Sequence, residues 1–188
     1  MAFFRLVPNL TIMAPKDFKE LEDMLEFAVE LKKPVVIRYP RGGESKEKFE
    51  KHSEIKFGKS EIIKTGKDIT IIAIGKTVVR AIEVSRMLEK DNIEAEVINA
   101  RFLKPFDKET IKESIEKTKK VITIEDGTII NGLATAVKEL IVDEKIKDVE
   151  IQNYSYPDKF IEHGNVEELE KLYKQDAKSI YDRIVEVQ

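Results

Sequence analysis

Short apolar runs alternate along the chain with amphipathic stretches, and this alternation predicts strands that alternate with helices. Runs typical of buried strands lie at residues 10–13, 35–37, 61–64, 69–73, 95–99, 121–124 and 149–154. Helical spacing of apolar residues follows Asp17, begins near Thr77, follows Asp107, and recurs at 134–141, 166–173 and 177–187. We therefore predict an α/β fold, with a mostly parallel sheet and helices on both of its faces.

The first 43 residues predict one strand–helix–strand unit. Asp17 is the expected N-cap of the helix, and Glu20 completes a capping-box pattern three residues later. One buried helix face is predicted from the residues at helical spacing, which are Phe18, Leu21, Met24, Leu25 and Ala28. Such a unit cannot bury all its apolar surface, and residues 1–12 add more, so we expect it to associate with a copy or a partner.

Residues 44–55 are polar and lack any periodicity, which predicts a linker between a segment at 1–43 and a domain at 56–188. In that domain, the turn sequence at 65–68 lies between two predicted strands, 61–64 and 69–73. This arrangement predicts a β-hairpin that adds one antiparallel edge strand to the sheet.

Two arginines follow the predicted strand at 35–37. Arg38 and Arg41 are separated by Tyr39-Pro40 and followed by two glycines. Open α/β sheets bind ligands just outside the carboxyl ends of their strands, and a guanidinium can donate two parallel hydrogen bonds to phosphate or carboxylate. The pair is a candidate anion site, although a solvated strand end is the more common explanation of such a pattern.

The composition excludes several classes of function. The 33 basic and 36 acidic residues give a net charge of −3, so no nucleic-acid partner is expected. The absence of cysteine excludes disulfides, zinc–thiolate sites and thiol nucleophiles. No apolar run has membrane-spanning length and residues 1–12 lack a signal-peptide cleavage pattern, so we expect a cytoplasmic protein without a membrane partner.

Other candidate residues point more weakly to chemistry. Glu125-Asp126-Gly127 at the end of a strand could bind a metal, but capping of the next helix is the favoured interpretation. His52 and His163 are too far apart in sequence to suggest a metal site, and a surface turn is favoured for His163 over a domain interface. The acidic residues of the first helix fall mainly on its polar face: Glu20, Glu22, Asp23, Glu26 and Glu30. Taken alone, the residues assemble no catalytic, cofactor or metal site.

Several segments together carry a family resemblance. They occur in order at residues 12–17, 38–42 (Arg-Tyr-Pro-Arg-Gly), 99–107, 123–126 and 160–164 (Phe-Ile-Glu-His-Gly). This series resembles the C-terminal part of the 1-deoxy-D-xylulose-5-phosphate synthases, a transketolase-like family that depends on thiamine diphosphate. The resemblance covers essentially the whole chain. It implies that residues 1–43 are the tail of a pyrimidine-binding domain, a βαβ remnant, and that 56–188 form a transketolase-like C-terminal domain.

The resemblance also implies an activity. The family condenses pyruvate with D-glyceraldehyde 3-phosphate, giving 1-deoxy-D-xylulose 5-phosphate and CO2 for isoprenoid precursors, thiamine and pyridoxal. Arg41 matches the arginine that binds the acceptor phosphate, and Arg38 matches a neighbour with at most a supporting role. The family's cofactor-activating glutamate, catalytic histidines and Gly-Asp-Gly magnesium motif have no counterpart here. We therefore expect thiamine diphosphate and Mg²⁺ to be bound by upstream domains of a homodimeric enzyme, and this chain alone to bind neither and to be inactive.

Two alternatives remain open. One is the C-terminal half of a split transketolase, or a subunit of the 2-oxoacid dehydrogenase E1 β type, because these relatives share the two-domain pattern. The other is a non-catalytic dimerisation or assembly module.

Residues 125–127 and 130–132 also depart slightly from the glycine-richer form that is usual in the family.

Overall fold

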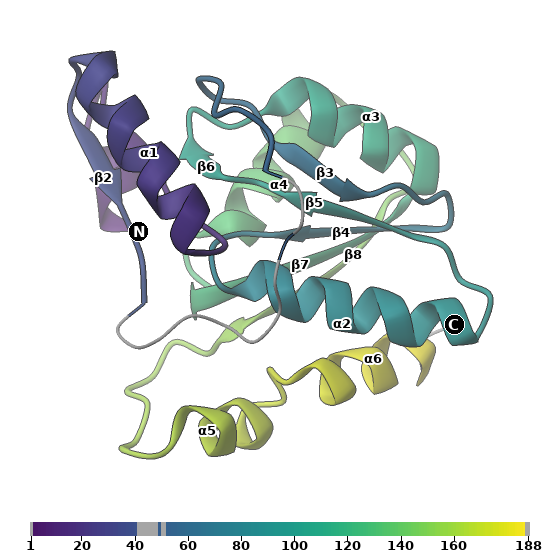
Figure 1. Ribbon diagram of the computed structural model, residues 1–188. Coiled ribbons are helices and arrows are strands. Elements are labelled where there is room, and N and C mark those ends of the chain that lie inside the picture. Colours follow the sequence, from purple (N-terminus) through teal and green to yellow (C-terminus); the bar gives the residue numbers. More distant parts are fainter. Residues whose placement is uncertain (1, 41–48, 50–51, 187–188) are drawn as a thin grey trace.

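Residues 2–40, 49 and 52–186, which the computed structural model describes, form two sheets (Figure 1). The larger sheet has the strand order β3-β5-β4-β7-β8. Its strands are β3 (Glu61–Lys64), β4 (Ile69–Ala73), β5 (Ala95–Asn99), β7 (Lys120–Thr128) and β8 (Glu150–Tyr156). All neighbours are parallel except β3, which pairs antiparallel with β5 at one edge. The predicted mostly parallel sheet with one antiparallel edge strand is confirmed.

Helices cover both faces of the larger sheet, as predicted (Figure 1). On one face, α2 (Thr77–Lys90) and α6 (Ala177–Glu186) pack against alternate strand residues such as Ile71 and Val97. On the other, α3 (Lys108–Thr118) and α4 (Leu133–Asp143) pack against residues such as Ile72 and Ile98. The short helix α5 (Val166–Leu172) has no fully buried residue. Two cores, one on each face, therefore hold the sheet in place.

The predicted hairpin is wrong, because β5 lies between β3 and β4. All five residues of β4 are buried, and a strand of that kind belongs in the sheet centre, where β5 and β7 both pair with it. The connection at 65–68 instead passes over the start of β5, where the backbone N–H groups of Lys67 and Asp68 both donate to the Glu94 carbonyl at 3.0 Å. A turn sequence shows that the chain reverses but not which strand it returns to.

The smaller sheet has the strand order β2-β1-β6. Strands β1 (Thr11–Met13) and β2 (Val35–Ile37) are parallel and joined by α1 (Phe18–Leu31), which confirms the strand–helix–strand unit. A short 3-10 helix, η1 (Phe3–Leu6), precedes them. The third strand, β6 (Phe102–Lys104), comes from the far side of the predicted linker and pairs antiparallel with β1. The two parts of the chain therefore share a sheet.

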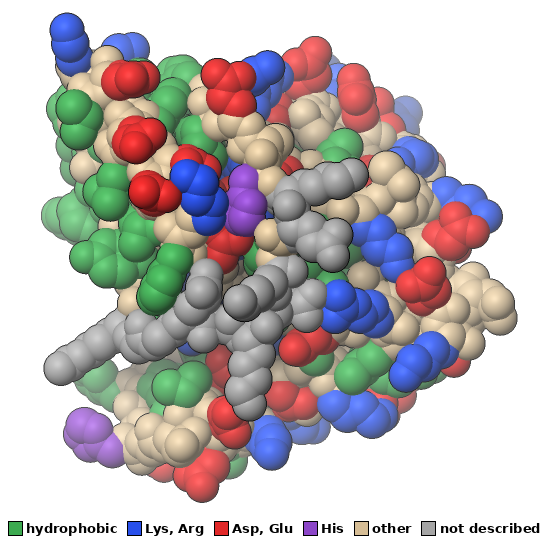
Figure 2. Space-filling view, viewed as in Figure 1, with side chains coloured by type: hydrophobic (Ala, Val, Ile, Leu, Met, Phe, Trp, Pro, Cys, Tyr) green, Lys and Arg blue, Asp and Glu red, His purple; other side chains and the backbone are tan. Residues whose placement is uncertain are grey.

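Helix α1 buries a different face from the predicted one. Of the predicted set, Met24 is buried, whereas Phe18 and Leu25 are 55% and 52% exposed, so the expectation of one buried face is wrong. The helix instead rests on β1 and β6 through Met24, Phe27 and Ala28. Figure 2 shows hydrophobic side chains gathered on the α1 and β2 side of the molecule. The apolar surface that this unit was expected to leave uncovered is present.

Candidate functional site

Arg38 directly follows β2, and its backbone N–H donates to the Met13 carbonyl at 2.8 Å. Its side chain extends to the carboxyl end of β7, where Nη2 donates to Asp126 Oδ2 at 3.1 Å and also to the Asp126 carbonyl oxygen. The side chain of Arg38 is 32% exposed. Arg41, the other candidate, lies outside the residues that the structure describes. Of the predicted pair, Arg38 is thus placed at a strand end.

Asp126 is shared between two cations. Lys76, which precedes α2, places Nζ 3.1 Å from Asp126 Oδ2 and 3.8 Å from Glu170 Oε1 on α5. Arg80 on α2 also pairs with Glu170. Burial alone would raise the pKa of the Asp126 carboxyl, but Lys76 and Arg38 outweigh it and lower that pKa. We call these five residues (Arg38, Lys76, Arg80, Asp126 and Glu170) the switch-point cluster.

The name reflects the position of the cluster in the sheet. The chain leaves β4 through α2 on one face to reach β5 on one side, and it leaves β7 through α4 on the other face to reach β8 on the other side. The connections therefore diverge between β4 and β7, and a crevice forms at such a point outside the carboxyl ends of the strands. Lys76 follows β4 and Asp126 lies in the carboxyl end of β7, so the cluster occupies the position where sheets of this kind bind ligands.

Glu125 directly precedes Asp126 in sequence, but its carboxylate contacts the start of α4 and not the cations of this cluster. Its two carboxylate oxygens accept the N–H groups of Leu133, at 2.9 Å, and Ala134, at 3.1 Å, which are the first residues of α4. The favoured helix-capping interpretation is confirmed. Burial raises the pKa of Glu125 and outweighs these two backbone hydrogen bonds, which lower it. In the described part of the chain, no three His, Asp or Glu side chains come together as a metal ion would require.

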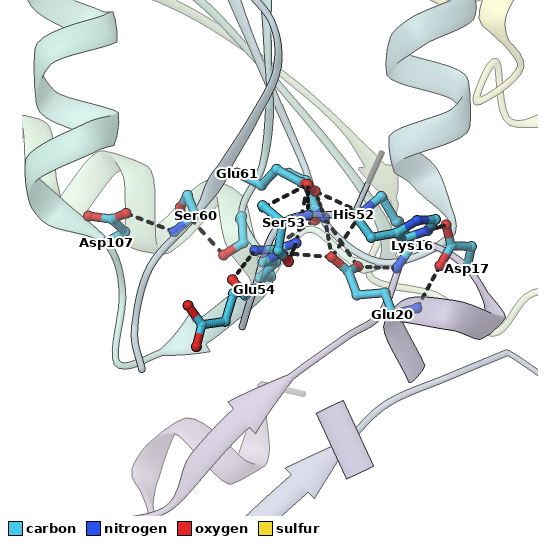
Figure 3. A network of polar contacts seen from close by, with 12 residues as sticks. Lys16, Asp17, Glu20, His52, Ser53, Glu54, Ser60, Glu61 and Asp107 are labelled. Carbon is cyan, nitrogen blue, oxygen red and sulfur yellow. Dashed lines mark hydrogen bonds and ion pairs between the residues drawn. The ribbon is translucent and has the colours of Figure 1, made fainter. Parts of the chain in front are cut away.

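A second polar network is buried between the two parts of the chain. Figure 3 shows Glu20 of α1 and Glu61 of β3 facing Lys16, whose Nζ lies 3.1 Å from Glu20 and 2.7 Å from Glu61. Arg101 lies 2.7 Å from Glu20 through Nε and 3.2 Å from Glu61 through Nη2. Asn99 donates to Glu20 Oε1 at 3.0 Å. Two cations and two carboxylates thus balance in a site whose side chains are almost completely buried.

This network was not predicted, because Glu20 was assigned to the polar face of α1. Glu20 is instead buried, and Asp17 still caps the helix by accepting the Glu20 N–H at 2.7 Å. The Glu20 carboxylate accepts the backbone N–H of Lys16, one residue before the cap, so the capping box is modified. One signal was available: residues 12–17 and 99–107, which both supply the network, also carry the family resemblance.

The two histidines lie in different parts of the structure and have different contacts. His52 Nε2 lies 2.7 Å from Asp17 Oδ2, so His52, which belongs to the predicted linker, contacts the start of α1. His163 is exposed in the connection between β8 and α5, as the surface-turn interpretation predicts. None of the described helices is long and apolar enough to cross a lipid bilayer. The candidate polar sites in the described part of the chain are therefore two clusters of cations and carboxylates. The network around Glu20 is buried, whereas the switch-point cluster is partly open to solvent.

Comparison with known families gives two matches. The model described as "Transketolase, C-terminal domain" matches residues 58–180, and "Transketolase, pyrimidine binding domain" matches residues 1–43. Among curated proteins, 1-deoxy-D-xylulose-5-phosphate synthase of Halothermothrix orenii is 40% identical over 97% of this chain and 29% of its own length. The enzyme of that name from Dictyoglomus turgidum is 42% identical over 100% of this chain and 30% of its own. The chain thus spans about three tenths of the length of these relatives.

Solved structures agree on the fold. A structure titled "Split gene transketolase, inactive beta4 tetramer" superposes with a TM-score of 0.90 at 30% identity, covering 98% of this chain and 60% of that one. Transketolase from Campylobacter jejuni superposes with a TM-score of 0.66 at 19% identity, covering 98% of this chain and 27% of that one. The second likeness concerns the fold alone.

Proposed function

This chain belongs to the transketolase family, and we propose that it supplies the C-terminal part of a 1-deoxy-D-xylulose-5-phosphate synthase. The observation that carries this proposal is the identity of about 40% to curated synthases over nearly the whole chain. The reaction is the condensation of pyruvate with D-glyceraldehyde 3-phosphate, with loss of CO2. Because the chain spans about three tenths of those relatives, the active enzyme needs the remaining portion, in the same polypeptide or in another.

In this proposal, the acceptor phosphate is bound by Arg41 with support from Arg38. Position supports the assignment of Arg38, because its guanidinium contacts Asp126 at the carboxyl end of β7 and its side chain is partly exposed. Guanidinium groups suit phosphate because they present two donors in one plane. The proposed role of Arg41 rests on the resemblance and on its position three residues after Arg38.

Thiamine diphosphate, when bound, supplies the carbanion chemistry of the family. The described residues do not fit the diphosphate–Mg²⁺ end of that cofactor, because the Glu125 carboxylate is taken up by the start of α4 and that of Asp126 by two cations. We therefore place the cofactor in the remaining portion of the assembled enzyme. This chain contributes acceptor binding and interdomain support.

The surface for that remaining portion is the apolar side of α1. Phe18, Leu25 and Val29 follow one another at helical spacing and are all more than half exposed. Among the described strands, β2 pairs only with β1, so it also offers a strand edge beside this helix. We propose that the rest of the pyrimidine-binding domain packs here, in an enzyme that works as a cytoplasmic homodimer.

The test is reconstitution. The chain is combined with a polypeptide covering the remaining portion of the synthases, and CO2 release is measured with pyruvate, D-glyceraldehyde 3-phosphate, thiamine diphosphate and Mg²⁺. We expect turnover from the combination and none from either part. Arg41→Ala should raise the KM for D-glyceraldehyde 3-phosphate, whereas Arg86→Ala, at an exposed position on α2, should leave it unchanged. An unchanged acceptor KM in Arg41→Ala would remove that residue from the site.

A split transketolase is the second candidate. It is favoured by the TM-score of 0.90 and 30% identity to the structure titled as a split-gene transketolase. The two candidates differ in donor, because a transketolase transfers a two-carbon unit from a ketose phosphate without releasing CO2. Product formation from a ketose phosphate, with no CO2 release from pyruvate, would establish the second candidate in place of the first.

A further inference from the structure

Arg38 is held by a residue of the other part of the chain. Asp126 is 88 residues away in sequence, yet its carbonyl oxygen and Oδ2 both accept hydrogen bonds from Arg38. Both bonds use the same guanidinium nitrogen, Nη2. Asp126 therefore contacts the guanidinium only at Nη2, and it makes no hydrogen bond to Nη1 or Nε.

Asp126 is itself held by its neighbours. It lies near the carboxyl end of β7, between the paired residues Ile124 and Thr128, and Lys76 contacts the same Oδ2 atom that Arg38 contacts. Lys76 and Arg80 in turn pair with Glu170, which ties α5 to the cluster. Each contact restricts the rotation of the next side chain. Arg38 is thus at the end of a chain of contacts that begins in the core sheet.

The charges of the cluster still favour an anion. Arg38, Lys76 and Arg80 carry three positive charges against the two negative charges of Asp126 and Glu170. Because Asp126 shares its charge with Lys76, it does not fully neutralise Arg38. Among these five residues one positive charge is left over. The neighbouring Glu125 also interacts with the charge of Arg38, but its two carboxylate oxygens accept the N–H groups at the start of α4.

We propose that Asp126 is a positioning residue that orients Arg38 toward the phosphate of the acceptor, so that the C-terminal domain helps to build the acceptor site. This inference rests on the proposed function, since it takes D-glyceraldehyde 3-phosphate as the acceptor. The benefit comes from orientation: a guanidinium already held in the binding geometry loses less rotational freedom when phosphate binds.

Neutralisation and positioning predict changes of opposite sign in the KM for the acceptor when Asp126 is removed. If Asp126 only neutralises Arg38, its removal strengthens phosphate binding, and the KM for the acceptor falls. If it positions Arg38, Asp126→Ala raises that KM by about tenfold, the equivalent of one charge-assisted hydrogen bond. Asp126→Asn keeps a side-chain oxygen that accepts from Nη2, so it should recover part of the loss.

The kinetic arm uses the reconstituted enzyme. The KM for D-glyceraldehyde 3-phosphate should rise in Asp126→Ala and rise less in Asp126→Asn, while kcat and the KM for pyruvate stay within twofold. With unphosphorylated D-glyceraldehyde as acceptor, the variants should not differ from the parent. Glu116→Ala, at an exposed position on α3, is the matched control. An acceptor KM that is unchanged or lowered in Asp126→Ala overturns the inference while the synthase function stands.

A binding arm keeps the inference testable if reconstitution fails. Inorganic phosphate is titrated into the isotope-labelled 188-residue chain, and the guanidinium signal of Arg38 is followed by NMR. We expect Asp126→Ala to bind phosphate severalfold more weakly and to give a broader Arg38 signal than the parent. Equal affinity in the parent and the variant overturns the positioning role. Absence of turnover in the unmodified reconstituted enzyme counts against the proposed function alone.

Discussion

Arg101 Nε lies 2.7 Å from Glu20 Oε1, and both side chains are almost completely buried. Glu20 belongs to α1 and Arg101 to the connection between β5 and β6, so this ion pair joins the two parts of the chain. Lys16 and Glu61 complete the charge balance around it. Polar groups buried in this way are costly to separate, because each depends on the others for its hydrogen bonds.

Glu20→Ala should therefore destabilise the chain strongly. The variant leaves Lys16 and Arg101 facing Glu61 alone, and loss of one partner of a buried pair costs about 3–5 kcal/mol of unfolding free energy. Urea unfolding of the two proteins measures the difference. Glu22→Ala is the matched control, because Glu22 lies on the same helix with an exposed side chain and should change little. Similar unfolding midpoints for both variants would show that the network adds no stability.

The switch-point cluster should weaken in acid. The pKa of Asp126 is lower in the folded chain than in the unfolded chain, whose value is about 3.9. A carboxyl of this kind stabilises the fold above that value, and the contribution is lost as the pH falls through the lowered pKa. Urea midpoints measured between pH 3 and 7 should thus fall in acid by more for the parent than for Asp126→Asn.

Its neighbour Glu125 supplies the control of opposite sign. The pKa of Glu125 is raised in the folded chain, so its contribution to stability grows as the pH falls through that raised value. Relative to Glu125→Gln, the parent should gain stability on mild acidification, until the pH reaches the unfolded-state value of about 4.3. The same trend for both residues would contradict the assignment of one to a cation cluster and the other to a helix start.

Gly66 is required by the connection that replaces the predicted hairpin. A Cβ at this position would lie 2.3 Å from the backbone carbon of Ala95, which cannot move without displacing β5. We expect Gly66→Ala to lower the unfolding free energy by about 1–3 kcal/mol, the usual cost of overpacking. At Gly127 the nearest atom to a Cβ, Glu125 Oε2, lies 3.7 Å away, so Gly127→Ala is the control and should be tolerated. Thermal unfolding of both variants would measure the difference.

Val29→Lys should block assembly without harming the fold. Val29 is 78% exposed on the apolar side of α1, where the remaining portion of the enzyme is proposed to pack. Reconstituted activity should fall at least tenfold, while the urea midpoint of the chain alone stays the same. Val142→Lys changes a similarly exposed valine on α4 and should leave activity intact. Equal activity in the two variants would place the docking surface elsewhere.

The sequence predicted those features that depend on local pattern. The apolar runs at 69–73 and 95–99 mark strands correctly, because fully buried strands need continuous apolar residues. The helix caps at Asp17 and Asp107 were also predicted from local sequence patterns. Each of these side chains accepts a backbone N–H three residues later, as expected. Arg38 was placed at a strand end for the same reason. Its partner Asp126 was not predicted, since no sequence pattern links residues 88 positions apart.

The failures share a different cause. Strand β6 has only two apolar residues, Phe102 and Leu103, and it pairs with β1, which is far from it in sequence. The burial of Glu20 depends on Lys16 and Arg101 meeting it in the fold, and helical spacing alone placed it on a polar face. The order of β3, β5 and β4 likewise depends on which strands pair, because all residues of both β4 and β5 are buried. These are properties of tertiary packing, and they appear once the elements are placed together.

The pairing of β6 with β1 bears on how such an enzyme can move. Backbone hydrogen bonds join a strand from each side of the predicted linker, and the Glu20–Arg101 pair lies next to them. A swing of one part against the other would have to break this ladder. In the proposed enzyme, we therefore expect admission of substrate and release of product to depend on motion in the portions that pack against this chain.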